Sequence, residues 1–425
     1  MKKYIFVIFL FISITFIYGQ TESDFRVSLT SDNTGAVITS YTNRSLSVIR
    51  IPEIIQDFPV KEIGDRVFKN NTTITSVILP STLEKIGDEA FNGCRNLTTV
   101  TIPASIVSIE FVTNLVKRRE SGRDVEYNTT NFGDCNLTFS TQVALKQRGY
   151  PFKFYSKEIG YYTVQLLDDY TGLIITRFGN KNELNFNDLK TKSMTTISDV
   201  NIPSTMEGVS VKVIGSNSFQ LPDNLRGKDV YSARIWIENR IVIPEGVEII
   251  GEKAFSSSSS SFGQGFISVI LPSTLKIIEK GAFSNCRNLN NILIPGNVIL
   301  LGEDAFYRCE KLTQVNIQQN TQLNNRIIGN GAFSNCSKLN NVIIPEGITE
   351  IGEYAFSSCS SLTSITLPTT ITKIGHRAFS YSGLTTIIIP ETVGIIEFGD
   401  NIFQNTKFTL PIQADLRRRG YTGSF

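Results

Sequence analysis

The chain of 425 residues contains one histidine, His376, and no Cys-x-x-Cys pair. A zinc site needs several such ligands, so zinc binding is not expected. Nothing beside His376 suggests a nucleophile, which argues against a Ser-His-Asp or Cys-His enzyme. His376 stands where other copies of the repeat described below have Asp88, Glu303 or Glu353, so we interpret it as a solvated side chain. No metal, cofactor or catalytic residue is expected.

The chain also lacks an excess of charge of either sign, with 41 Lys and Arg against 39 Asp and Glu. Such a balance gives no long-range attraction for nucleic acid or anionic lipid, so nucleic acid is not an expected partner. No run after residue 18 is apolar enough to span a bilayer. We therefore expect no integral membrane span once the N-terminal segment is removed.

That N-terminal segment has the pattern of a secretory signal peptide. Lys2 and Lys3 precede an uncharged apolar run over residues 4–18, and Gly19 and a polar stretch follow. We assign residues 1–20 to a signal peptide and expect a secreted or cell-surface protein, with the periplasm as the alternative. Because Ile17 is bulky where cleavage prefers a small residue, an uncleaved anchor is the other interpretation.

A repeat of about 23 residues is the strongest signal in the sequence. Phe68 and Phe91, like Phe333 and Phe356, lie 23 residues apart. The full frame is Leu362-x-x-Ile365-x-Leu367-Pro368-x-x-Ile371-x-x-Ile374-Gly375-x-x-Ala378-Phe379. Its Ile-x-Leu step predicts a short strand with one buried face, which the proline ends. One coil cannot bury its own apolar residues, so coils must stack into a solenoid.

The frame Ile-Pro-x-x-(Ile/Val)-x-x-Ile-Gly-x-x-Ala-Phe-x-x-Cys resembles the BspA-like leucine-rich repeats of bacterial surface proteins, over most of residues 50–410. The resemblance implies a β-rich leucine-rich repeat solenoid. It also implies an extracellular binding protein such as an adhesin, although the fold does not dictate the function.

Two capped modules are predicted, because both ends of the repeat array occur twice. The starting motif Asp32-x-Thr34-Gly35 reappears as Asp169-x-Thr171-Gly172 and predicts a hairpin. The ending motif occurs at residues 142–150 and again at 413–421, and predicts a short helix. We assign residues 21–155 to a small module and 156–425 to a large one with about eight coils.

Insertions interrupt the period at three places. The segment 222–240 around Trp236 is interpreted either as a partner-binding loop or as a lid on the solenoid. The serine run 256–261 is interpreted as a solvated loop, with modification left open. The small module has 16 extra residues around Lys117–Glu120, which predict a surface loop.

The remaining chemical candidates have structural explanations. Six cysteines, Cys94, Cys135, Cys286, Cys309, Cys336 and Cys359, share one frame position, which favours buried free thiols over disulfides or a metal site. Asp168 and Asp169 belong to the repeated turn rather than to a glycosidase pair. Gly329-x-Gly331 lacks the third glycine of a phosphate loop. Residues 417–419, an arginine triplet, are interpreted as part of a solvated cap helix.

The predicted binding surface follows from strand alternation, which turns the residue between two buried aliphatic residues outward. These outward residues form what we call the central row: Val242, Ile270, Leu293, Asn316, Ile343, Thr366 and Ile388. The residues two positions earlier form the polar row: Ser268, Asn291, Gln314, Asn341, Ser364 and Thr386. An apolar stripe with a polar margin favours protein binding, so an extracellular or cell-surface protein is the expected partner, with a glycan as a further possibility. The alternatives are that β-propensity alone selected the aliphatic residues or that the Trp236 insertion covers them.

Overall fold

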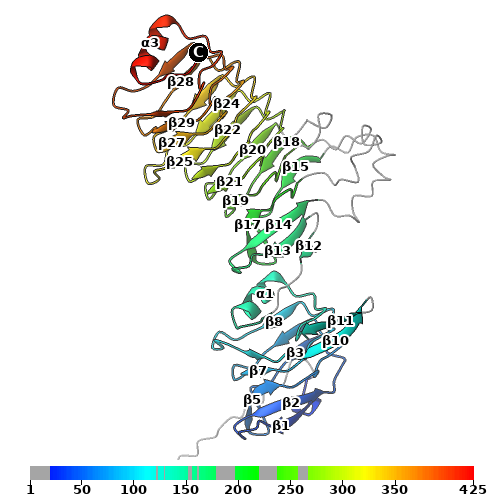
Figure 1. Ribbon diagram of the computed structural model, residues 1–425. Helices are drawn as coiled ribbons and strands as arrows, with labels where there is room; N and C mark the ends of the chain where they lie inside the picture. Colours follow the sequence, from blue (N-terminus) through cyan, green and yellow to red (C-terminus); the bar gives the residue numbers. More distant parts are fainter. Residues whose placement is uncertain are drawn as a thin grey trace, which may run out of the picture. The chain divides into compact units, whose positions relative to one another are not determined.

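The computed structural model describes residues 20–120, 123–128, 130–151, 156–159, 162–178, 197–219, 237–256 and 267–425. The assigned signal run, Trp236 and all of the serine run except Ser256 lie outside these ranges. The chain divides into two compact units, Met1–Phe154 and Tyr155–Phe425. Each unit is a β-solenoid with its own caps (Figure 1).

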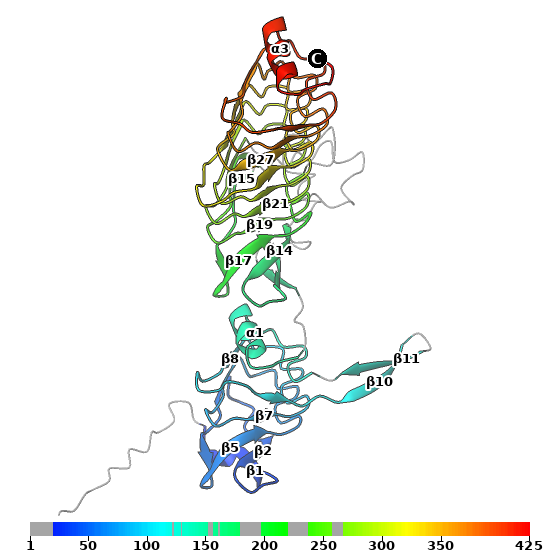
Figure 2. The same ribbon diagram turned by 60° about the vertical axis from the view of Figure 1, so that its left-hand side comes forward.

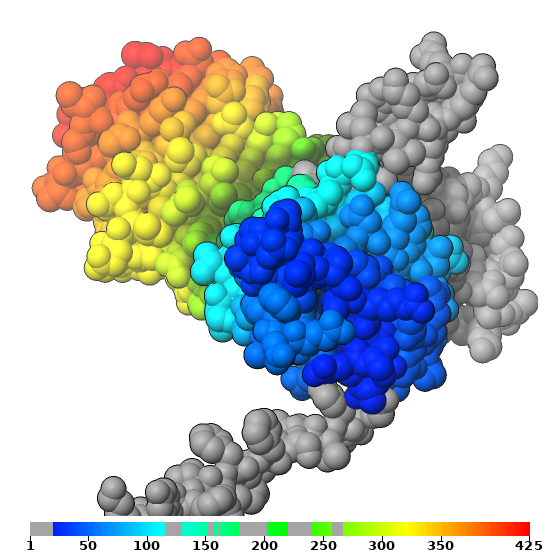
Figure 3. Space-filling view, turned by 90° about the horizontal axis from the view of Figure 1, so that it is seen from below, coloured from blue at the N-terminus to red at the C-terminus, as the bar shows by residue number. Residues whose placement is uncertain are grey.

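Unit 1 begins with a short 3-10 helix, η1 (Glu22–Asp24), and the predicted hairpin, in which β1 pairs antiparallel with β2. Its first sheet contains β1 (Phe25–Leu29), β2 (Ala36–Tyr41), β5 (Phe58–Ile63), β7 (Lys85–Ile86) and β9 (Glu110–Phe111), with β4 (Ile54–Ile55) paired to β5. Its second sheet contains β3 (Val48–Arg50), β6 (Ser76–Ile78) and β8 (Thr99–Thr101). The N-terminal residues, in dark blue, cover the end of this unit that faces the viewer in Figure 3.

The other end of unit 1 has the predicted helix, α1 (Phe139–Lys146). Thr138 is its N-cap, and the Thr138 side chain accepts a hydrogen bond from the Thr141 backbone amide. The extra residues that the sequence placed in a surface loop instead form a hairpin of β10 (Leu115–Glu120) and β11 (Arg123–Asn128), which projects from the unit (Figure 2). In its register Lys117 faces Glu126 and Arg119 faces Asp124.

Unit 2 repeats this plan over more coils. The sheet that contains its cap hairpin, here called the secondary sheet, has the strands β12 (Lys157–Ile159), β13 (Tyr162–Leu166), β14 (Leu173–Phe178), β17 (Val209–Ile214), β19 (Ile249–Ile250), β21 (Ile277–Ile278), β23 (Leu300–Leu301), β25 (Arg326–Ile328), β27 (Ile348–Ile351), β29 (Lys373–Ile374) and β31 (Glu397–Phe398), with β16 (Thr205–Met206) paired to β17. The helix α3 (Leu410–Arg418) closes the C-terminal end, as the ending motif predicted.

The strands of the Ile-x-Leu step form the second surface of unit 2, here called the primary sheet. They run in parallel through β15 (Ile197–Asn201), β18 (Ile237–Val242), β20 (Ser268–Ile270), β22 (Asn291–Ile294), β24 (Gln314–Ile317) and β26 (Asn341–Ile343). The series continues as a separate pair, β28 (Ser364–Thr366) and β30 (Thr386–Ile388). Successive coils therefore add one strand each to the same face (Figure 1).

The core of unit 2 contains a stack of phenylalanine rings, one from each coil. Neighbouring ring centroids are 4.6 to 5.9 Å apart along Phe219, Phe255, Phe283, Phe306, Phe333, Phe356, Phe379 and Phe403. In the four coils of unit 2 that have a cysteine, the thiol donates to a phenylalanine carbonyl of the preceding coil, as Cys309 does to Phe283 at 3.4 Å. The frame repeats because every coil must fill the same core position.

Candidate partner-binding surface

The register of the primary sheet brings the central row into line. Val242 pairs with Ile270, Leu293 with Asn316, and Asn316 in turn with Ile343. Thr366 pairs with Ile388 in the last two strands. The residues on either side of the row members point inward and are buried, such as Ile292 and Ile294 around Leu293, except that Ile387 beside Ile388 is half-buried. The buried neighbours fix the orientation of the row, because a shift by one residue would expose them.

The central row is accessible over most of its length. The exposed fractions are 41% for Ile270, 48% for Leu293, 46% for Ile343 and 54% for Ile388. Thr366 is exposed, whereas Asn316 and Val242 are half-buried. Single exposed aliphatic residues are common on soluble proteins, but a line of them on adjacent strands marks a contact surface more often.

The polar row runs parallel to the central row on the same strands. Ser268 pairs with Asn291, Asn291 with Gln314, and Gln314 with Asn341. Ser364 pairs with Thr386 in the separate strand pair. All of these side chains are exposed except that of Ser268, which is half-buried. Arg240 extends the polar row by one exposed position at β18.

A third exposed row, here called the turn row, was missed by the sequence analysis. It precedes the polar row by one residue and consists of Ile267, Asn290, Thr313, Asn340, Thr363 and Thr385. Alternation along a strand would turn these residues inward, but they lie just before the strands begin. The signal that would have found them is their polar composition, Ile267 apart, since the inward strand positions of this repeat are aliphatic.

From β20 to β30 these three rows contain no ionisable side chain. Their members are asparagine, glutamine, serine, threonine, isoleucine and leucine, in a chain with 19% charged residues. Charged residues are depleted at the centres of protein interfaces, where their desolvation is costly. The composition of this face therefore matches that of an interface centre rather than that of an ordinary solvated surface.

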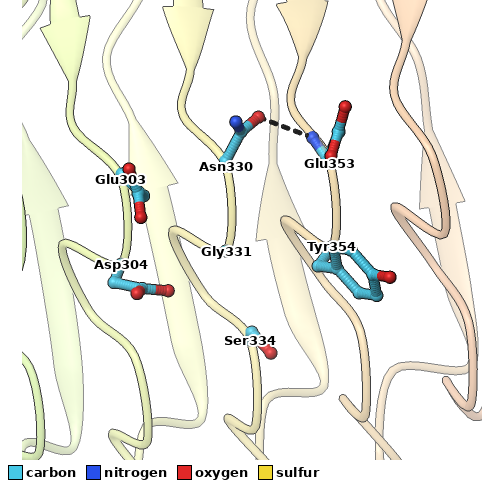
Figure 4. A pocket seen from close by; sticks show the side chains of 7 residues that line it. All are labelled: Glu303, Asp304, Asn330, Gly331, Ser334, Glu353 and Tyr354. Carbon is cyan, nitrogen blue, oxygen red and sulfur yellow. Dashed lines mark hydrogen bonds between the residues drawn. The ribbon is translucent and has the colours of Figure 1, made fainter.

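A shallow hollow of about 380 Å³ lies elsewhere on unit 2, among the turns that precede Ala-Phe (Figure 4). Glu303, Asp304 and Glu353 line it together with Asn330 and Tyr354. Burial, followed by the negative charge of Glu303, raises the pKa of Asp304. The Glu303 carboxylate already pairs with Lys280 at 2.7 Å, and Asn330 accepts from the Glu353 amide at 2.8 Å.

The hollow has no recognisable ligand set. The described part of the chain contains no group of three or more His, Cys, Asp or Glu residues placed to hold a metal ion. Gly331, which also lines the hollow, has φ +61°, and a Cβ there would lie 2.2 Å from Asp304 Oδ1. This glycine permits close packing of adjacent turns, which explains the Gly-x-Gly sequence without a phosphate.

The other candidate residues have structural contacts. All six cysteines are free, and five are buried while Cys135 is half-buried. Asp169 accepts hydrogen bonds from the Thr171 amide and hydroxyl at 3.0 and 2.8 Å. The His376 ring packs edge-on against Tyr354 at 5.4 Å. At the C-terminal end of α3, the side chain of the C-cap residue Arg419 pairs with Asp415 at 2.9 Å.

No helix within the described ranges is long and apolar enough to cross a membrane.

The chain matches the family described as BspA type Leucine rich repeat region in six copies, over residues 38–114, 231–324 and 320–413. It is similar to a leucine-rich repeat protein from Bacteroides ovatus, with 20% identity, 91% of this chain and 92% of that chain covered, and a TM-score of 0.29. A leucine-rich repeat protein from Eubacterium ventriosum has 17% identity and a TM-score of 0.37, with 92% of this chain and 95% of that chain covered. A leucine rich cell surface protein from Faecalibacterium prausnitzii has 18% identity and a TM-score of 0.21, with 87% of this chain and 94% of that chain covered. No curated protein matches the chain.

Proposed function

The chain belongs to the BspA-type leucine-rich repeat family, and from that premise we propose that it is an exported, non-catalytic protein that binds an extracellular or cell-surface protein. The binding surface is the primary sheet of unit 2. The observation that supports this most directly is the uncharged face from β20 to β30, with its exposed aliphatic residues in the middle.

The chemistry of the face suits a protein partner. The exposed aliphatic residues of the central row supply apolar area, and the flanking amides and hydroxyls both donate and accept hydrogen bonds. The strands fix these groups in place, so little conformational entropy is lost on binding. A glycan would use the same amides and hydroxyls, but none of the three rows contains an aromatic ring for it to pack against.

The size of the face limits the affinity. The six strands from β20 to β30, about 4.8 Å apart, extend about 24 Å along the solenoid, and three to four residues per strand span about 10–13 Å. A flat footprint of about 240–310 Å² is smaller than the roughly 800 Å² per partner of a standard interface. We expect either a transient complex or a partner that also contacts the turns beside the strands.

The test replaces the aliphatic centre of the face. Ile270→Ser, Leu293→Ser and Ile343→Ser are combined in one variant, which should fold because Asn316 and Thr366 already place polar side chains at the same frame position. Proteins captured from extracellular material by the parent chain are identified and purified, and their dissociation constants are measured against both proteins. Truncations at an interface centre cost about 1–2 kcal/mol each, so the dissociation constant should rise at least about 100-fold. Equal binding by a folded triple variant would exclude this surface.

Surface labelling of intact cells tests the location. A cell-surface protein reacts with an impermeant reagent, whereas a periplasmic structural or assembly protein, the alternative function, is protected. N-terminal sequencing of the exported form should find a start close after Gly19, and Met1 retained in a membrane fraction would instead indicate an anchor.

A further inference from the structure

Gln20, where the assigned signal segment ends, is bound to a strand of unit 1. Its side chain donates a hydrogen bond from Nε2 to the Arg50 carbonyl at 2.8 Å and accepts one at Oε1 from the Arg50 backbone amide at 3.0 Å. Gln20 is buried, with 3% of its surface exposed. The next residue is also held in place, because the Thr21 amide donates to Asp24 Oδ2 at 2.9 Å. One side-chain amide therefore pairs with both backbone groups of one strand residue.

The contact covers an open edge of a sheet. Within the described part of unit 1, β3 is the last strand of its sheet and pairs with β6 on one side. The Ile51 amide donates to the Ile78 carbonyl across that pair at 3.0 Å, so the backbone groups of Arg50, one residue earlier, point to the other edge. An open strand edge can pair with another chain unless something covers it. At Arg50 the Gln20 amide takes the place of a neighbouring strand.

Unit 2 begins differently at the corresponding point. Lys157 precedes Tyr162 by five residues, as Gln20 precedes Phe25 in the matching start motif. Lys157 begins β12, which pairs antiparallel with β13, and its ammonium binds Glu207 at 2.6 Å. Of the two start motifs, only the one that follows the signal segment is preceded by glutamine.

A glutamine at the N-terminus of a chain has a reaction that an internal glutamine lacks. Its α-amino nitrogen can attack Cδ of its own side chain, and the new N–Cδ bond closes a five-membered lactam, pyroglutamate. The Cδ–Nε2 bond breaks, and Nε2 leaves as ammonia with a proton taken from the attacking amine. The reaction needs no oxidant, reductant or second substrate. Because the pKa of an α-amino group is about 7.7–8.0, part of the amine is unprotonated and nucleophilic at neutral pH.

We propose that export cleaves the chain between Gly19 and Gln20, and that Gln20 is then converted to pyroglutamate, which stays bound to Arg50. This inference rests on the proposed export of the chain. The sequence places the start close after Gly19 without deciding on which side of Gln20 the cut falls, and a cut after Gln20 would remove the contact with Arg50. The lactam suits the site, because its N–H and carbonyl oxygen lie on the same side of one C–N bond, as Nε2–H and Oε1 do in glutamine. It can therefore donate to the Arg50 carbonyl and accept from the Arg50 amide.

Ring closure changes the N-terminus in two ways. It fixes side-chain torsions that a glutamine must otherwise give up when it binds, so the contact with the strand edge becomes stronger. It also removes the free α-amine that aminopeptidases require, which would protect an exported protein from digestion at this end. The first residue of the exported chain thus covers a strand edge and blocks the N-terminus at once.

The test is mass spectrometry of the N-terminal peptide of the full chain after export from its own cells. The expected peptide begins at residue 20 and is lighter than its unmodified form by one ammonia. Edman sequencing should give no residue until a pyroglutamyl peptidase has removed the lactam, and Thr21 should then come first. A synthetic peptide with an open Gln20, carried through the same steps, measures the lactam formed during handling, and the exported chain should exceed it.

The outcomes separate this inference from the proposed export. A peptide that begins at Gln20 with a free amine overturns the lactam and leaves the export intact. A start at any other residue also overturns the lactam, and a start at Met1 contradicts the removal of the signal segment as well.

The contact with Arg50 is tested by Gln20→Ala, which removes both the ring and the two hydrogen bonds. Deuterium exchange of the Arg50 amide, followed in a peptide that contains β3, should become about tenfold faster or more. Glu22→Gln, at an exposed position nearby, is the matched control and should leave the exchange unchanged. Equal exchange in the cyclised parent and in the Gln20→Ala protein would show that the lactam is not bound at this edge.

Discussion

Replacing one ring of the phenylalanine stack should destabilise unit 2 strongly, and Phe306→Ala is the most informative substitution. The Phe306 ring is fully buried and stacks on Phe283 at 5.1 Å and on Phe333 at 5.4 Å. The plane of the Phe306 ring is 5° from parallel to the ring plane of each neighbour. The ring therefore belongs to both interfaces of its coil.

Two contributions set the magnitude. Truncation of a buried phenylalanine costs about 3–5 kcal/mol through lost burial and the cavity that remains. Each stacked pair adds about 0.5–1.5 kcal/mol beyond the buried area, and Phe306 loses two pairs. Because the surrounding coils are held by continuous strand ladders, the cavity should not collapse, and we expect a loss at the upper end of the range, about 4–5 kcal/mol. In a solenoid each coil contacts only its neighbours, so the unfolding transition should also lose cooperativity.

Urea unfolding followed by both circular dichroism and tyrosine fluorescence measures the two effects. Ile395→Ala is the control, because Ile395 is 96% exposed and its truncation should change the free energy of unfolding by less than about 0.5 kcal/mol. A folded Phe306→Ala protein that loses less than about 1 kcal/mol would refute the reasoning, since the ring would then be contributing no more than a surface residue.

Two further predictions concern single groups. Burial raises the pKa of the Cys94 thiol to about 11 and raises the pKa of each of the other five thiols. Thiol reagents should therefore react with the six cysteines only after unfolding. A mass change on reduction of the native protein would contradict this. The Ser273 backbone amide donates a hydrogen bond to Glu245 Oε1 at 2.9 Å and lowers the pKa of Glu245 below its ordinary 4.5. This hydrogen bond stabilises the folded protein above that pH, and the stabilisation is lost as the pH falls through the lowered pKa. Glu245→Gln should therefore reduce stability at pH 7 and flatten its decline in acid, as measured by thermal unfolding at several pH values, and an unchanged decline would count against the assignment.

Much of the fold could be predicted because each coil must pack into the same core, so the same residue pattern recurs many times. The Ile-x-Leu step, the proline after it and the Ala-Phe pair recur in most coils, and each has one structural explanation. The cap hairpins were predicted from Asp-x-Thr-Gly, and the structure supplies the reason, since Asp32 accepts hydrogen bonds from Thr30 and Thr34. These hydrogen bonds hold the pKa of Asp32 far below its ordinary value.

Features that occur once were harder to predict. The hairpin of β10 and β11 lies in an insertion outside the repeat frame, so the repeat gives no information about its strands. The left-handed turns were also missed, because only some coils place glycine there. Gly331 has φ +61°, but the same turn holds Asp304 at +53° and Tyr354 at +55°. Non-glycine residues tolerate this conformation at a cost of about 1 kcal/mol each, which the surrounding coils must offset.

The candidate surfaces were predictable to different degrees for a physical reason. An inward position of this solenoid must be filled by a residue that packs into the core, so the residue type there indicates the fold and little else. An outward position accepts Ile270, Asn316 or Thr366 on one sheet and Leu300 or Lys373 on the other, with the same backbone beneath. The residue types at outward positions are therefore not determined by the fold and can serve binding. The alternation rule found the central row because it asks which residues point outward, but it was applied to one sheet only. Applied to the secondary sheet as well, the same rule finds aliphatic residues from Ile174 on β14 to Ile327 on β25 and charged residues in the three coils that follow.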